Sequence, residues 1–119
     1  MDGVLILAHG SKKKETEETL NSIVNKVKDK TGLEFVVPAY LQFSEQNLLK
    51  GIEELVDNGV NNIKIIPMFL FDGIHVTQDI PEELDRVMSL YPGVSIKMSS
   101  YLGNDDRIAD IIIDRINSL

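Results

Sequence analysis

The sequence predicts an α/β fold: a single three-layer domain spanning residues 1–119, with a four-stranded parallel sheet of order 2-1-3-4 and helices on both faces. Four apolar runs alternate with four segments of helical spacing along the 119 residues. Such alternation is typical of parallel sheets joined by right-handed helical crossovers. Two of the runs are nearly continuous in valine, isoleucine and leucine, as strands buried on both faces should be. Four strands are too few for a barrel, so we expect half of a flavodoxin-like sheet.

The first half of the chain predicts two strand–helix units. Strands are expected over residues 3–8 and 33–41. Each is followed by a segment whose apolar residues recur every three or four positions, which is the spacing of one helix face. These two stripes are Leu20, Ile23, Val24 and Val27, then Leu48, Leu49, Ile52, Leu55 and Val56. Gly32 and Gly59 come just after the stripes, where a helix favours a left-handed residue at its end.

The second half repeats this pattern. Strands are expected over residues 62–70 and 94–99, and Gly93 is expected to end the helix between them. Asn104 is expected to cap the last helix, with acidic residues in its first turn. The two helical stripes are Leu84, Val87 and Met88, then Ile108, Ile111, Ile112 and Ile116.

Composition excludes several functions. The chain has 12 basic and 19 acidic residues and a net charge of −7, which opposes general nucleic-acid binding. No apolar run approaches the roughly 18 residues of a membrane span, and no signal-peptide pattern is recognised near the N-terminus. The absence of cysteine excludes disulfides, thiolate metal sites and a cysteine nucleophile. We expect a cytoplasmic protein.

The strand order predicts where a ligand binds. Strands 1 and 3 are neighbours whose following loops diverge, and open α/β sheets bind ligands in that crevice. The only two histidines of the chain, His9 and His75, lie in these two loops. Imidazole is a common metal ligand and a base near neutral pH. Without cysteine the two histidines suit an open, transient metal site, and the alternative is that each is a surface residue without chemistry.

The loop after the third strand is unusually apolar. Met68 and Phe69 are interpreted as the end of the buried strand, whereas Phe71 and Ile74 should be covered by a flat apolar ligand or by a partner chain. Gly73 lets this loop bend or lets a ligand approach its backbone.

Three consecutive lysines, at positions 12–14, follow the His9 turn in this acidic protein. They indicate either an anionic ligand, helped by the amides that open the first helix, or a solvated helix face. Ser11 is interpreted as a capping serine and not as a nucleophile, because adjacent side chains in a tight turn seldom align. No phosphate-binding loop, dinucleotide fingerprint or nucleophile elbow is present.

Two segments together carry a resemblance to a known family. Ala-His-Gly-Ser at residues 8–11 and Pro-Met-Phe-Leu-Phe-Asp-Gly-Ile-His-Val-Thr-Gln-Asp-Ile-Pro at residues 67–81 resemble the short-form sirohydrochlorin cobaltochelatases, which are class II tetrapyrrole chelatases. Tyr-Leu-Gly at residues 101–103 also resembles the family, and the likeness covers essentially the whole chain. The resemblance implies a chelatase-like fold and ATP-independent insertion of a divalent metal into sirohydrochlorin.

The resemblance also implies roles for particular residues. His9 corresponds to the family's proton acceptor and metal ligand, and His75 to its second metal-binding histidine. Glu45 corresponds to an acid that contacts the substrate; its alternative role is a first-turn acid of the second helix. Gln42 replaces a second acid that relatives often carry. The other implied substrate contacts are Leu70, Phe71, Asp72, Gly73 and Ile74, and Ser11 and Lys12 beside His9 complete the candidate set. Asp79 is interpreted as a cap of the third helix.

No permanently bound cofactor is expected, because the metal is a substrate: cobalt is favoured, and nickel or iron stays open. Longer relatives carry two similar domains, so we expect this chain to work as a homodimer with sirohydrochlorin and a divalent metal as its ligands.

Two alternatives remain. One is a non-catalytic metal- or tetrapyrrole-binding module. The other is a histidine phosphatase, which the alanine at position 8 disfavours because an arginine stands there in that class.

Overall fold

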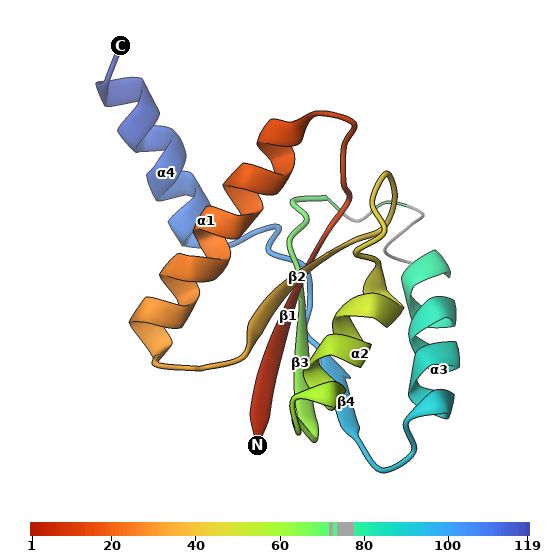
Figure 1. Cartoon of the computed structure of the whole chain (residues 1–119). Coiled ribbons are helices and arrows are strands. Elements are labelled where there is room, and N and C mark those ends of the chain that lie inside the picture. Colours follow the sequence, from red (N-terminus) through yellow and green to blue (C-terminus); the bar gives the residue numbers. More distant parts are fainter. Residues whose placement is uncertain (72, 74–77) are drawn as a thin grey trace.

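The computed structural model describes residues 1–71, 73 and 78–119 of the chain. Strands and helices alternate along it (Figure 1). The eight elements are β1 (Asp2–Ala8), α1 (Lys14–Thr31), β2 (Val36–Tyr40), α2 (Leu48–Asp57), β3 (Asn62–Pro67), α3 (Ile80–Leu90), β4 (Ser95–Met98) and α4 (Asp106–Asn117). The predicted alternation is therefore confirmed.

The four strands form one parallel sheet in the order β2-β1-β3-β4, which confirms the predicted topology. Ala8 pairs with Tyr40 of β2, and Leu7 pairs with Pro67 of β3. The carboxyl ends of these three strands therefore lie level at one edge of the sheet. The loops that follow them therefore begin at the same edge, where the ligand-binding crevice is predicted.

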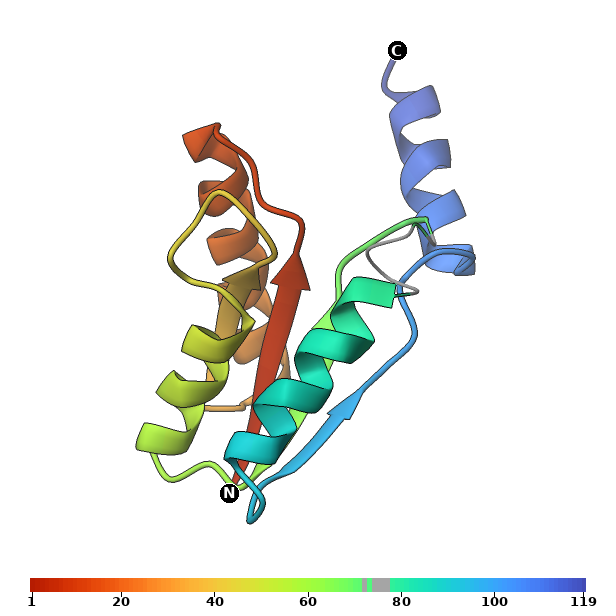
Figure 2. The ribbon, with the colours of Figure 1, turned by 90° about the vertical axis from the view of Figure 1, so that its right-hand side faces the viewer.

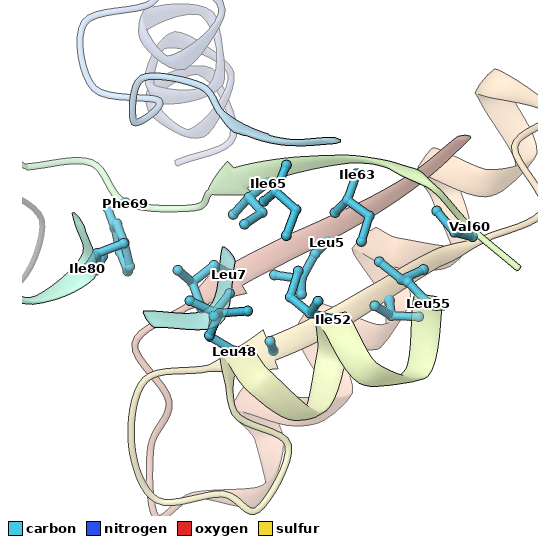
Figure 3. Close-up of a cluster of buried hydrophobic side chains, with 14 residues drawn as sticks. Leu5, Leu7, Leu48, Ile52, Leu55, Val60, Ile63, Ile65, Phe69 and Ile80 are labelled. Atoms are coloured by element: carbon cyan, nitrogen blue, oxygen red, sulfur yellow. The ribbon is translucent and has the colours of Figure 1, made fainter. Parts of the chain in front are cut away.

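Side chains alternate between the two faces of the sheet, and each face is covered by different helices (Figure 1). Helices α2 and α3 cover the larger cluster, in which Leu5, Leu7, Ile63 and Ile65 of the sheet meet Leu48, Ile52, Leu55 and Ile80 (Figure 3). Helix α1 covers a smaller cluster made of Ile6, Leu20, Val24, Val36 and Tyr40. Gly51 lets α2 approach closely, because a Cβ there would lie 2.6 Å from the Leu5 side chain.

Several predicted boundaries were wrong by a few residues. The second strand starts at Val36, not at residue 33, and the third ends at Pro67, not at residue 70. Gly32 and Gly59 take the expected left-handed conformation, but Gly93 does not. Asn104 does not cap α4: the carboxylate of Asp105 does, accepting a hydrogen bond of 2.9 Å from the Arg107 amide.

Helix α4 departs from the prediction that all four helices cover the sheet. None of its residues is buried, and it extends away from the body beyond the carboxyl edge (Figure 2). Where it would lie over β3 and β4, the strands present the exposed side chains of Lys64 and Lys97. The apolar face of α4 would offer these ammonium groups no partner charge, so covering them with that face would cost desolvation. In the part of the chain that is described, no helix has both the length and the apolar character needed to cross a membrane.

Candidate functional site

Backbone hydrogen bonds hold the loops after β1, β2 and β3 together at the carboxyl edge. The Leu41 amide donates to the Ala8 carbonyl at 3.0 Å, and the Gln42 amide donates to the His9 carbonyl at 3.1 Å. On the other side of β1, the Met68 amide donates to the Leu7 carbonyl at 2.7 Å. The loop that carries His9 is therefore fixed between its two neighbours.

Gly10 is required for this close approach. Its φ is 93°, in the left-handed region that favours glycine. A Cβ at this position would lie 2.1 Å from the Gln42 carbonyl oxygen, which is backbone and cannot move aside easily. The glycine of the His-Gly-Ser turn thus has a structural reason: it lets the His9 loop cross the β2 loop.

His9 is exposed at the end of β1, and its ring rests against Phe69. The ring centroids are 4.5 Å apart and the planes are tilted by 55°. Phe69 itself is only 4% exposed, and its carbonyl accepts hydrogen bonds from the Leu102 and Gly103 amides. A buried ring held in this way gives the imidazole a fixed apolar support on one side while another side faces solvent.

The interpretation of Met68 and Phe69 as the end of the buried strand was wrong in its boundary, because β3 ends at Pro67. Both residues lie in the loop that follows, where Met68 is half-buried and Phe69 is buried. Sequence reasoning missed the contact between Phe69 and His9, because period-two patterning says nothing of ring contacts between loops. The only signal was that both residues follow adjacent strands.

Leu70 and Phe71 continue the apolar loop and are 49% and 83% exposed. Gly73 is exposed as well. The structure thus leaves two large apolar side chains on the surface next to buried Phe69. Three residues of the predicted site, Asp72, Ile74 and His75, lie outside the described residues, so the pairing of His9 with His75 stays a prediction.

Ser11 and the three lysines lie at the start of α1. Helix α1 begins at Lys14, so Ser11 is not its cap, and that interpretation was wrong. The Ser11 hydroxyl instead accepts a hydrogen bond of 3.1 Å from the Lys13 amide and closes the turn before the helix. Ser11, Glu17, Phe43 and the lysines at positions 12–14 line a hollow of about 400 Å³.

Glu45 is exposed in the loop between β2 and α2. Its carbonyl accepts a hydrogen bond from the Asn47 amide, and Asn47 is the residue that caps α2. Glu45 therefore precedes the helix, which makes the alternative of a first-turn acid wrong. Gln42 is exposed in the same loop. Asp79 occupies the N-cap position of α3, but its backbone is already helical and its side chain makes no capping hydrogen bond, so the expected cap is met in position only.

Two further features describe the chemistry of this edge. Burial, and to a smaller extent the charge of Glu17, raises the pKa of Tyr40, which ends β2 beneath the Gly10 turn. Among the residues that the structure describes, no three histidine, aspartate or glutamate side chains gather as a metal-binding group. The exposed donors at this edge include the His9 imidazole and the Glu45 carboxylate.

Comparison with known proteins supports the resemblance. The model of the CbiX family matches residues 3–119. The sirohydrochlorin cobaltochelatase of Sulfurisphaera tokodaii is 30% identical over 119 residues, which cover 100% of this chain and 94% of that protein. The sirohydrochlorin ferrochelatase of Priestia megaterium is 32% identical over 117 residues, which cover 98% of this chain and 44% of that protein.

A solved structure, SirB from Bacillus subtilis with Fe3+, matches with a TM-score of 0.89 and 26% identity. The match covers 98% of this chain and 46% of that one. The chain therefore spans about half the length of some relatives and nearly the whole length of others.

Proposed function

The chain belongs to the CbiX family, and from that premise we propose that it is a sirohydrochlorin cobaltochelatase, which inserts a divalent metal into sirohydrochlorin without ATP. The observation that carries the proposal is His9: an exposed imidazole supported by buried Phe69, at the sheet edge where this topology binds ligands. The full-length match to a relative named a cobaltochelatase supports the choice of reaction.

In the proposed mechanism His9 acts as base and as metal ligand. Insertion replaces two pyrrole protons by one metal ion, so a base has to accept each proton and pass it to water. A neutral imidazole suits this step near pH 7. We propose His75 as the second ligand of the incoming metal. Two imidazoles hold a divalent ion weakly enough to release it to the four macrocycle nitrogens.

The surroundings of His9 suit a flat, polycarboxylate substrate. Leu70 and Phe71 present exposed apolar surface, which a macrocycle face would remove from water. Lys12 and its neighbours supply positive charge for the substrate's carboxylates, and the Ser11 loop and Glu45 stand at the same edge. We propose that Asp72, Gly73 and Ile74 complete the substrate contacts.

Cobalt is the proposed metal, because the Sulfurisphaera tokodaii relative, of which the match covers 94%, is named a cobaltochelatase, whereas the match covers only 44% of the Priestia megaterium ferrochelatase. Affinity at a histidine site follows the general divalent series and does not by itself select cobalt, so nickel and iron are competing substrates. We propose no resident cofactor. We propose that the reaction takes place in the cytoplasm, whose reducing environment suits a chain without cysteine.

We further propose that the working protein is a homodimer in which a second copy packs over α4. Four isoleucines of this helix, at positions 111, 112, 113 and 116, are 52–62% exposed. A hollow of about 740 Å³, lined by the turn before α4 and by the helix itself, adjoins them. Burying this apolar surface would favour association. The match covers 98% of this chain but only 46% of the solved relative, and we propose that a second copy supplies what the remaining part of that longer chain supplies there.

The test is metallation of sirohydrochlorin by the purified protein, followed by absorbance, with cobalt, nickel and ferrous iron in turn. We expect multiple turnovers with cobalt. His9→Ala should slow the reaction by about a hundredfold or more, because the general base is lost, while the circular dichroism spectrum stays unchanged. Stoichiometric binding without turnover would contradict the proposal and favour a binding module. Normal metallation by His9→Ala would refute the assigned base.

The homodimer is tested by sedimentation at micromolar concentration. We expect a species near twice 13.3 kDa. A clean monomer that still metallates sirohydrochlorin would contradict the proposed pairing.

A further inference from the structure

Phe43 combines two unfavourable features. Its φ of 62° makes it the one non-glycine residue in the left-handed region among the described residues. Phe43 is also 55% exposed, whereas Phe69 and Tyr40 are buried. A bulky residue in this conformation is strained, and exposed apolar surface adds no stability in return. Backbone strain of this kind persists only where the surrounding structure imposes it, and it clusters at functional sites.

Hydrogen bonds on both sides fix this conformation. The Gln42 amide, directly before Phe43, donates to the His9 carbonyl at 3.1 Å. Directly after it, the Ser44 hydroxyl accepts a hydrogen bond of 3.1 Å from the Gln46 amide. The hydrogen bonds of its neighbours thus determine the backbone conformation at Phe43. One of them, from the Gln42 amide to the His9 carbonyl, connects this segment directly to the loop that carries His9.

The ring meets a lysine of the His9 loop. The Nζ atom of Lys12 lies 5.5 Å from the centroid of the Phe43 ring, within the range of a cation–π interaction. Both side chains line the hollow at the start of α1, together with Lys13 and Lys14. An aromatic face and an ammonium group therefore stand next to each other beside the candidate site.

We propose that Phe43 is a further substrate-binding residue: its ring packs against the macrocycle and holds Lys12 where the ammonium meets a carboxylate of the substrate. This inference rests on the proposed function. The macrocycle is flat and conjugated and carries acidic side chains. Its flat face can therefore pack against an aromatic ring while one of its carboxylates meets an ammonium group. Holding Lys12 against the ring in advance reduces the side-chain entropy that binding would otherwise cost.

The experiment measures binding of metal-free sirohydrochlorin by quenching of its fluorescence, without added metal. Phe43→Ala should raise the Kd by about three- to tenfold, the size of a lost aromatic contact. Phe43→Trp should retain tight binding. Leu90→Ala is the matched control: Leu90 is 61% exposed at the far end of α3, so its removal should leave the Kd unchanged.

A glycine variant separates the ring from the backbone. Phe43→Gly removes the ring and also relieves the left-handed strain, so it should raise the melting temperature and still weaken binding. A variant that is both more stable and a weaker binder cannot be explained by partial unfolding. If Phe43→Gly and Phe43→Ala both bind sirohydrochlorin as the unmodified protein does, the proposal for Phe43 is overturned although the proposed function stands.

A double substitution tests the pairing with Lys12. If the ring holds the ammonium, Phe43→Ala combined with Lys12→Gln should weaken binding by less than the product of the two single effects. A rise in Kd equal to the product of the two single effects would refute the coupling. Loss of self-association in Phe43→Ala would instead assign the ring to an interface between copies. Failure of the unmodified protein to bind sirohydrochlorin would overturn the proposed function, and this inference with it.

Discussion

Helices α2 and α4 have similar apolar patterns but opposite surroundings. In α2, Leu48, Ile52 and Leu55 are almost completely buried against the sheet. In α4, which has at least as many large apolar residues, none is buried. The difference lies in what each helix could cover. The sheet face under α2 is apolar and Gly51 allows close contact, whereas β3 and β4, which α4 would have to cover, present Lys64 and Lys97. An amphipathic pattern therefore predicts that a helix has an apolar face, but not that its own chain covers that face.

The largest effect that tests this comparison is on stability. Ile52→Ala should lower the free energy of unfolding by about 2–5 kcal/mol, because it leaves a cavity in the main cluster. Ile112→Ala in α4 should change it by less than about 0.5 kcal/mol when the monomer is observed at high dilution. Urea denaturation measures both. Equal losses would mean that α4 packs against its own chain in solution.

The next effect concerns association. Replacing Ile111 and Ile113 together by serine should raise the dimer dissociation constant at least tenfold, since each exposed isoleucine contributes about 1 kcal/mol or more when a partner buries it. Sedimentation equilibrium over a range of concentrations measures this constant. The matched control is Met88→Ser together with Leu90→Ser on α3, two exposed apolar residues outside α4. An unchanged constant in the α4 variant would assign the interface elsewhere.

Caps of the two helices provide a third comparison. Asn47→Ala removes the side chain that accepts a hydrogen bond from the Lys50 amide. It should lower the free energy of unfolding by about 1 kcal/mol, because α2 unfolds only together with the core. Asp105→Ala removes the corresponding cap of α4. We expect faster amide exchange in α4 alone and no change in the urea midpoint. A shift of that midpoint as large as for Asn47→Ala would mean that both helices belong to one cooperative unit.

Much of the fold was predictable from the sequence because its signals are local or repeated. Alternating strands and helices require a parallel sheet, and Gly32 and Gly59 end their helices because glycine has no Cβ to oppose a left-handed turn. The prediction that Asn104 caps α4 was wrong, because Asp105, one residue later, is equally suited to cap a helix and has Arg107 beside it. That Arg107 also holds the pKa of the Asp105 carboxyl well below its usual range.

The site was predictable only as far as topology determines it. Strand order predicted that His9 lies at the carboxyl edge of the sheet, and the structure has it directly after β1 at that edge. The ring contact with Phe69 depends on the path of a loop, for which periodicity carries no signal. Phe43 was missed for a related reason: phenylalanine seldom adopts positive φ, so propensity argues against the conformation that the neighbouring loops impose.

The smallest expected effect is on the face that α1 covers, where Tyr40 is buried near Glu17. Burial first, and the negative charge of Glu17 second, raise the pKa of this phenol above its ordinary value of 10.0. The folded state then binds the proton more tightly than the unfolded state does. Stability from this difference is fully present below pH 10 and is lost as pH rises through the folded pKa.

Urea midpoints measured from pH 9 to pH 11 should therefore fall in the unmodified protein and fall less in Tyr40→Phe, which has no phenolic proton to lose. Helix α4 has no comparable buried titratable group, so Asp110→Asn should leave the alkaline slope unchanged. Equal slopes in all three proteins would show that Tyr40 is not buried from water by α1.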